Sequence, residues 1–259
     1  MSEIQMIKGD CLEEMKNIKD KSIDLILCDL PYGTTTTFTK KSSWDNIIPF
    51  EPLWEHYERI IKDNGVICLF ACQPFTSKLI MSNLPLYKYN WTWVKKSCPT
   101  GFLNSHFQPL KTVEDICIFS KAPAAYSPKG SINYFPIMGE GKPYERVQNA
   151  HKATAISKAR KYTGKVSKSN GERYPKNVLE FSRDREGYHP TQKPVKLLEY
   201  LIKTYTKEGW TVLDNCSGSF STAVACYNLN RNFIGIEKDD KFFATGVNRI
   251  SNLRIGTLF

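Results

Sequence analysis

The sequence predicts an α/β protein with a doubly wound, mostly parallel sheet, and three observations support this prediction. Short continuous apolar runs bounded by turn residues, such as residues 22–29 and 65–72, are typical of buried parallel strands. Segments with helical apolar periodicity alternate with such runs in the first 120 residues and again after residue 186. The 259 residues suffice for one large α/β domain, or for a core with a smaller insert.

The expected elements follow in order along the chain. We expect a first long helix over residues 52–65, with apolar or aromatic side chains on one face and a stop at Gly65. The other expected helices cover residues 74–84, 194–205, 221–229 and 240–250. The expected strands cover residues 22–29, 65–72, 89–94, 114–120, 210–215 and 232–238.

Composition and charge narrow the class of protein. The hydrophobic share of 41% and charged share of 24% are those of a soluble globular chain, and the net charge of +10 favours a polyanionic partner such as nucleic acid. No apolar run is long enough to span a bilayer, and the N-terminus lacks the apolar core of a secretory signal. Eight cysteines without a CxxC pair and four scattered histidines indicate reduced, buried thiols and no metal site. We therefore expect a cytoplasmic protein without membrane association.

Residues 121–185 differ from the rest of the chain. This segment holds 14 Lys and Arg against 5 acids, a net +9, with interleaved aromatic residues and little apolar periodicity. Basic side chains neutralise phosphates and aromatic rings stack on bases, so the segment predicts nucleic-acid contact; an inert solvated loop is the alternative. The candidate DNA-binding residues are Lys152, Lys158, Arg160, Lys161, Lys165, Lys168 and Arg173.

A strand, a tight turn and a helix are expected over residues 211–226, TVLDNCSGSFSTAVAC. Gly218 lets the backbone pass close to a ligand, and the helix start supplies unpaired N–H groups. The next strand ends at Glu237, where a carboxylate can accept hydrogen bonds from both ribose hydroxyls. The pattern is a generic nucleoside site, and a turn glycine followed by a surface acid explains it as well.

The stretch CDLPYG, residues 28–33, ends the first buried strand. Side chains at such a strand end leave the core and can meet a ligand. Asp29, Pro31 and Tyr32 therefore form either a plain turn or a catalytic lip.

These motifs together resemble those of the amino-group DNA methyltransferases. DLPYG is similar to their D-P-P-Y motif, DNCSGS (214–219) to their AdoMet-binding motif, and HPTQKP (189–194) to the motif that opens the helix beside AdoMet. The order of catalytic motif, basic insert, HPTQKP and cofactor motif resembles the permuted β class. GDCLEEM (9–15) and DNGVICLFACQPF (63–75) look like segments of phage and bacterial N6-adenine methyltransferases, so the resemblance covers nearly the whole chain outside the basic segment.

The resemblance implies S-adenosyl-L-methionine (AdoMet) as cofactor and a role for each motif. Asp29 and the carbonyl of Leu30 would accept hydrogen bonds from the target amino group, Pro31 would stiffen the turn, and Tyr32 would stack on a base rotated out of the duplex. Aspartate rather than serine at position 29 favours adenine N6 over cytosine N4. The implied cofactor residues are Asp10, Asp214, Cys216, Gly218, Ser219, Glu237, Thr191 and Lys193. A turn acid explains Asp10 nearly as well, and a helix start explains Thr191 and Lys193 equally well.

Two residues depart from the family pattern. Leu30 replaces a proline, which is tolerable where only the carbonyl acts. Phe220 stands where the family carries glycine beside the AdoMet methionine moiety. Its side chain would crowd the cofactor, require a positive φ, or point harmlessly into the core.

The resulting hypothesis is a sequence-specific DNA adenine N6-methyltransferase acting on double-stranded DNA, in a phage or restriction–modification setting. Residues 1–120 and 186–259 would form its AdoMet-dependent catalytic domain, and the basic residues 121–185 its target-recognition region. The alternatives are a catalytically silent DNA-binding homologue disabled at Phe220, and a cytosine N4 or RNA methyltransferase. A homodimer remains open.

Overall fold

The computed structural model describes residues 2–33, 45–96, 99–148, 165–184 and 192–256. The chain divides into two compact units. The larger unit comprises Met1–Phe135 and Asn177–Phe259, and the smaller one comprises Pro136–Lys176. Residues 121–135 and 177–184, which the sequence-based bounds placed in the basic insert, thus belong to the larger unit.

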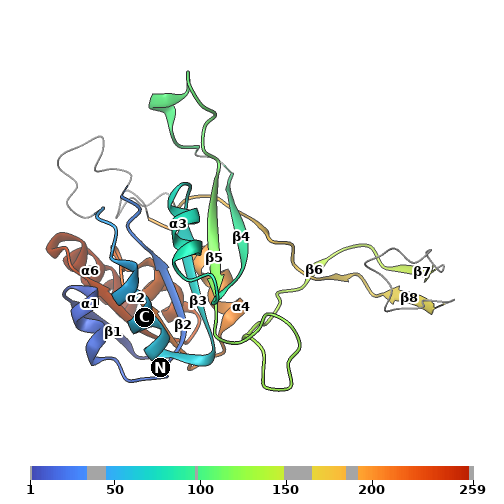
Figure 1. Ribbon diagram of the computed structural model, residues 1–259, viewed down its shortest axis with the longest axis horizontal. Helices are drawn as coiled ribbons and strands as arrows, with labels where there is room; N and C mark the ends of the chain where they lie inside the picture. Colours follow the sequence, from blue (N-terminus) through green and yellow to red (C-terminus); the bar gives the residue numbers. More distant parts are fainter. Residues whose placement is uncertain (1, 34–44, 97–98, 149–164, 185–191, 257–259) are drawn as a thin grey trace. The chain divides into compact units, whose positions relative to one another are not determined.

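The larger unit is built on an eight-stranded sheet in the order β1-β12-β11-β2-β3-β5-β4-β10 (Figure 1). Five of the neighbouring pairs are parallel, and only the two pairs that involve β5 are antiparallel. The predicted doubly wound, mostly parallel sheet is therefore confirmed. The strands are β1 (Ile4–Lys8), β2 (Ile23–Asp29), β3 (Ile61–Ala71), β4 (Tyr87–Lys95), β5 (Val113–Phe119), β10 (Val178–Phe181), β11 (Thr211–Asp214) and β12 (Asn232–Glu237).

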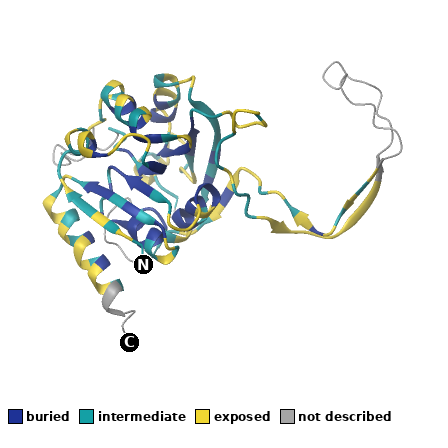
Figure 2. Ribbon diagram, turned by 90° about the horizontal axis from the view of Figure 1, so that it is seen from below, coloured by how far each residue is buried: buried dark blue, intermediate teal, exposed yellow. Residues whose placement is uncertain are grey.

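Helices cover both faces of this sheet. Alternate residues of β2 enter two separate cores: Leu25 and Leu27 pack with α4 and α5, whereas Ile26 and Cys28 pack with α2 and α3. Figure 2 shows the resulting burial of the central strands. The helices are α1 (Cys11–Glu14), α2 (Phe50–Ile60), α3 (Phe75–Ser82), α4 (Val195–Tyr205), α5 (Ser221–Asn228) and α6 (Asp240–Gly256), with 3-10 turns η1 (Met15–Asn17) and η2 (Phe102–Asn104). Among the described residues, no helix combines the length and apolar character that a bilayer crossing requires.

The first long helix ends earlier than the sequence suggests. Helix α2 stops at Ile60, and Ile61 already pairs with Ile23 of β2, so the expected continuation to Gly65 is wrong. Gly65 serves the strand instead. A β-carbon there would lie 2.8 Å from Cγ1 of Ile61, so the irregular start of β3 needs a residue without a side chain.

The smaller unit consists of two antiparallel strand pairs. Strand β6 (Gly139–Glu140) pairs with β9 (Glu172–Arg173), and β7 (Tyr144–Gln148) pairs with β8 (Lys165–Ser169). Its ten Lys and Arg against three acids leave a net charge of +7, so most of the excess charge of the chain lies in this unit.

Candidate active site

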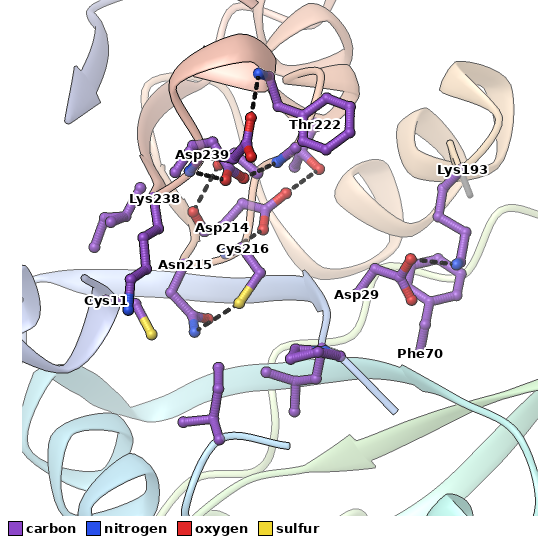
Figure 3. Close-up of a pocket in the computed structure, with 18 of the residues that line it drawn as sticks. Cys11, Asp29, Phe70, Lys193, Asp214, Asn215, Cys216, Thr222, Lys238 and Asp239 are labelled. Carbon is purple, nitrogen blue, oxygen red and sulfur yellow. Dashed lines mark hydrogen bonds and ion pairs between the residues drawn. The ribbon is translucent and has the colours of Figure 1, made fainter. Parts of the chain in front are cut away.

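A cavity of about 740 Å³ opens at the carboxyl edge of the sheet in the larger unit. The chain leaves β2 towards β3 on one side and β11 towards β12 on the other, so these two neighbours form a topological switch point. Loops diverge at such a point and leave room for a ligand. Residues that end or follow β1, β2, β11 and β12 line the cavity, including Asp10, Asp29, Cys216 and Glu237. Figure 3 labels Asp29 and Cys216 among them.

Asp29 is the last residue of β2, and its carboxylate faces the cavity. The Tyr32 hydroxyl donates a hydrogen bond of 2.6 Å to its Oδ1. The ring of Tyr32 packs against that of Phe75, with 5.1 Å between ring centroids. Leu30 is 3% exposed and Pro31 lines the cavity, so the CDLPYG stretch presents an acid and an aromatic face to one space.

Lys193, which immediately precedes the proline before α4, reaches this lip. Its ammonium pairs with Oδ2 of Asp29 (Figure 3). The same ammonium lies 3.5 Å from Oε2 of Glu114 in β5. Glu114 in turn pairs with Lys95 at 2.5 Å. The Lys95 and Lys193 side chains are 3% and 7% exposed, and those of Glu114 and Asp29 are 12% and 24% exposed. Two cations and two anions therefore alternate in a largely buried row, which we call the ion row and in which Asp29 is the most exposed member.

Burial and charge act against each other in the ion row. Burial raises the pKa of Asp29, with Glu114 adding to the shift, while Lys193 and the Tyr32 hydroxyl oppose it. Burial disfavours the Lys193 ammonium, but Asp29 and Glu114 together outweigh it and raise the pKa of the lysine. Burial likewise opposes ionisation of Glu114, and the charges of Lys193 and Lys95 overcome it, which lowers the pKa of Glu114. The raised pKa of Lys193 favours its charged form, and the raised pKa of Asp29 makes it more basic than an ordinary aspartate.

The turn after β11 forms the opposite wall. Asp214 accepts hydrogen bonds from the Thr222 hydroxyl at 2.6 Å and the Cys216 backbone N–H at 3.2 Å. Burial raises the pKa of Asp214 to about 7, despite these two donors. Gly218, at φ 51°, donates its N–H to Oε2 of Glu237 at 2.7 Å. The glycine turn and the acid at the end of β12 are therefore in direct contact, with Ser219 also on the cavity wall.

Two further acids lie at strand ends: Glu237 is the last residue of β12, and Asp10 lies two residues after the end of β1. Glu237 accepts a second backbone hydrogen bond, from Asp239 at 2.7 Å, and burial raises its pKa. Asp10 caps α1 through the Leu12 N–H at 3.0 Å and pairs with Lys238 at 2.9 Å. The hydrogen bond from Lys238 is the main reason why the pKa of Asp10 lies below its ordinary value. Each carboxylate oxygen of the two acids binds one donor and can accept a further hydrogen bond, and both residues line the cavity.

Phe220 has a positive φ of 59° but is fully buried and does not line the cavity. Its ring packs against Phe243 of α6, with 5.9 Å between centroids. Two glycines make room for it: a β-carbon at Gly246 of α6 would overlap the ring, and one at Gly235 of β12 would lie 2.7 Å from its Cε1. Of the three sequence-based outcomes, the structure thus combines the positive φ with the side chain in the core, away from the cavity.

The DNA-binding candidates fall mostly outside the described residues. Lys168 pairs with Glu145 at 3.1 Å across the β7–β8 ladder, and the two side chains are 69% and 59% exposed. Arg173 hydrogen-bonds Ser169 at 2.6 Å and lies over the Tyr144 ring, so it holds the smaller unit together. Lys165 lies in β8. The candidates outside the described part are Lys152, Lys158, Arg160, Lys161 and the cofactor candidate Thr191.

Sequence reasoning missed Glu114 and Lys95. Both carry a signal in strand alternation: Glu114 shares a face with buried Ile116 and Ile118, and Lys95 shares one with buried Trp91 and Trp93. A charged residue on the buried face of a strand needs an opposite charge nearby. That pattern alone would have marked both positions for attention.

The fold and cavity define the class of doubly wound α/β proteins that bind a ligand at a topological switch point. A family model described as DNA methylase matches residues 23–248, most of the chain. The chain therefore belongs to the N6/N4 DNA methylase family and is a DNA methyltransferase, with DNA as substrate.

Individual relatives are similar over nearly the whole chain. Type II methyltransferase M.HpaI from Haemophilus parainfluenzae is 28% identical over 270 residues, covering 96% of this chain and 74% of that protein. DNA adenine methyltransferase YhdJ from Escherichia coli (strain K12) is 28% identical over 261 residues, covering 95% and 82%.

Solved structures share the fold. The crystal structure of the M1.HpyAVI–SAM complex gives a TM-score of 0.61 at 24% identity and covers 95% of this chain and 98% of that chain. The cytosine-N4-specific PvuII DNA methyltransferase gives a TM-score of 0.64 at 16% identity and covers 96% and 86%. At these identities the likeness is one of fold.

Proposed function

We propose that the chain is an AdoMet-dependent, sequence-specific DNA adenine N6-methyltransferase of the β class, acting on a base rotated out of double-stranded DNA. The observation that carries this proposal is the convergence of Asp29 and Tyr32 with Gly218 and Glu237 on one cavity. A methyl donor and an acceptor base must meet within bonding distance. A single cavity with a catalytic lip on one wall and a nucleoside pattern on the other serves that purpose.

The residues present fit AdoMet. The cavity of about 740 Å³ has the size of a cofactor site, and the Phe220 ring does not enter it. Glu237 would accept hydrogen bonds from the ribose hydroxyls, because each carboxylate oxygen keeps a lone pair after binding its backbone N–H. Asp10 would reach the adenine end, and the turn at Asp214, Cys216, Gly218 and Ser219 would hold the methionine end.

The chain's own residues then prepare the amino group. The Asp29 carboxylate and the Leu30 carbonyl would accept its two N–H groups, which draws the nitrogen lone pair out of the ring system and frees it for attack. When bound, AdoMet supplies an electrophilic methyl group on a positively charged sulfur. Tyr32 would stack on the base. After transfer, the surplus proton of the nitrogen passes to Asp29, whose pKa burial raises.

Adenine is the favoured base because position 29 is aspartate, and the relative YhdJ is named as a DNA adenine methyltransferase. Cytosine N4 is the second candidate, favoured by the fold likeness to the cytosine-N4-specific PvuII enzyme. Both bases present an exocyclic amine that the same acceptors would hold.

The smaller unit, with its net charge of +7, is the proposed target-recognition region within residues 121–185. Phosphate contacts would set its register, and base-edge contacts would set the sequence. The relatives named as Type II methyltransferases support a modifying role beside a restriction enzyme, with the cytoplasm as the expected location.

Tritium transfer from labelled AdoMet to duplex DNA tests the proposal, with Asp29→Ala as the control. Label in DNA with wild type and none with the variant is expected. Nucleoside analysis of the product then separates the bases: N6-methyladenine supports the proposal, and N4-methylcytosine replaces it by the second candidate. No label above the control would contradict both.

A further inference from the structure

A hairpin tip at the carboxyl edge of the sheet carries exposed apolar side chains. Strands β4 and β5 continue past the sheet into residues 99–111, which we call the β4–β5 tip (Figure 1). Phe102, Leu103 and Phe107 on this tip are 63%, 93% and 90% exposed. Large apolar side chains so open to water in one short segment mark an interaction surface.

The tip is an ordered structure. Thr100 and Lys111 exchange backbone hydrogen bonds of 2.9 and 2.8 Å that close its base. Gly101, at φ 95°, then starts the turn η2, and the Phe107 and Gln108 N–H groups both bond to the Asn104 carbonyl. Backbone hydrogen bonds thus hold the apolar side chains outward.

The tip rises beside the cavity. Asp29 pairs with Phe70 in register, Phe70 with Ile116, and Val113 with Val94, so the tip leaves the sheet at the edge where Asp29 stands. Trp93 lies two residues before the end of β4, and Glu114 lies one residue after the start of β5. Both residues line the cavity. A duplex that delivers a base to Asp29 therefore passes close to the tip.

The tip carries no charge that would repel a polyanion. Residues 99–111 contain one lysine, the exposed Lys111, and no acid. A rotated base leaves a gap in the stack, and unstacking costs free energy that an inserted apolar side chain offsets. Phenylalanine and leucine are residues that DNA-bending proteins use as such wedges.

We propose that the β4–β5 tip is a wedge that enters the DNA stack next to the target base, with Leu103 and Phe107 as the inserting side chains. The inference rests on the proposed function, since it concerns how that function's substrate is opened. Its partner is duplex DNA at the target site, and a second copy of this chain is the competing occupant.

The test compares Leu103→Ser/Phe107→Ser with wild type on two oligonucleotide duplexes. The site is first mapped by methylation-sensitive sequencing of DNA from cells that express the wild type. In one duplex the target base is paired, and in the other its partner nucleotide is an abasic residue. The matched control is Met81→Ser/Leu84→Ser, which removes two other apolar side chains that are 69% and 52% exposed.

The wedge predicts a split between the two substrates. On the paired duplex the tip variant should lose about tenfold or more in kcat/KM, and on the abasic duplex it should stay within about twofold of wild type, because the base there needs little opening. 2-Aminopurine at the target position should brighten on binding wild type and much less on binding the tip variant. The control should match wild type in both measurements.

Equal losses on the two duplexes, or none, would overturn the wedge while leaving the proposed function intact. A wild-type dimer that the tip variant converts to monomer in sedimentation would assign the tip to a second copy instead. No methyl transfer by wild type to either duplex would refute the proposed function, and the wedge with it.

Discussion

Lys193 and Asp29 lie 164 positions apart in the sequence and form an ion pair inside the cavity. The pair continues through Glu114 to Lys95, so the acid proposed to hold the target amine is balanced by charges of the protein itself. Water contributes little to that balance, because both lysine side chains are almost fully buried. The charge state of Asp29 should therefore respond to changes at its partners.

Lys193→Met removes the cation between two buried carboxylates. Breaking a buried ion pair on one side costs about 3–5 kcal/mol of unfolding free energy. Since Lys193 lowers the pKa of Asp29, its loss should also move the acidic limb of the pH–kcat/KM profile to higher pH. Urea unfolding and a pH series measure the two effects. Lys203→Met, at an exposed position of α4, should change neither; an unmoved acidic limb in Lys193→Met would contradict the role given to the pair.

Glu114→Gln should shift the same limb in the opposite direction. Glu114 raises the pKa of Asp29 through its charge, so the neutral amide should let Asp29 ionise at lower pH. The variant also leaves Lys95 without its anionic partner and should lower stability. The same pH series measures this shift. If the acidic limb moves to higher pH, as expected for Lys193→Met, Glu114 acts only by stabilising the folded structure.

Gly246→Ala should destabilise the protein even though alanine favours helices. The added β-carbon overlaps the Phe220 ring, and such overpacking costs about 1–3 kcal/mol. Asn248→Ala, at an exposed position of the same helix, should be neutral or stabilising. In a double-mutant cycle monitored by urea unfolding, Phe220→Gly should relieve the cost of Gly246→Ala. If the two substitutions change the unfolding free energy additively, the explanation that the glycines make room for the Phe220 ring is wrong.

Phe220→Gly by itself should leave AdoMet affinity unchanged, because the ring lies outside the cavity. Titration calorimetry measures this. A large gain in AdoMet affinity would instead support the alternative hypothesis of a catalytically silent homologue, in which the Phe220 ring obstructs the cofactor.

Asp214 should make stability fall as pH rises. Its folded pKa of about 7 exceeds the ordinary aspartate pKa of 3.8, so the folded state holds the proton more tightly than the unfolded chain. Its contribution is therefore fully present below the unfolded pKa and is lost as pH rises through 7. The unfolding free energy of Asp214→Asn relative to that of wild type should increase as pH rises from 5 to 8, by at most about 4 kcal/mol. Urea unfolding at both pH values tests this, and parallel pH dependences would contradict it.

The sequence was sufficient to predict the fold class and the convergence of the motif residues at one edge of the sheet. Parallel strands share one carboxyl edge, so residues that end β2, β11 and β12 converge there whatever their distance along the chain. The ion row was not predictable in the same way. It depends on how deeply β4 and β5 are buried and on the approach of Lys193 from another segment, and neither follows from local periodicity. The direction of the Phe220 ring was equally hidden, because it depends on gaps at Gly235 and Gly246.

The position of β2 between β3 and β11 also affects how the protein folds while the ribosome is still synthesising it. At about 5–20 residues per second, Asp214 emerges roughly ten to forty seconds after Asp29. During that interval the apolar β2 has one edge without its partner, which is the kind of edge that recruits other chains. Nascent chains should therefore engage chaperones through this strand, and no DNA should be modified before translation has passed β12.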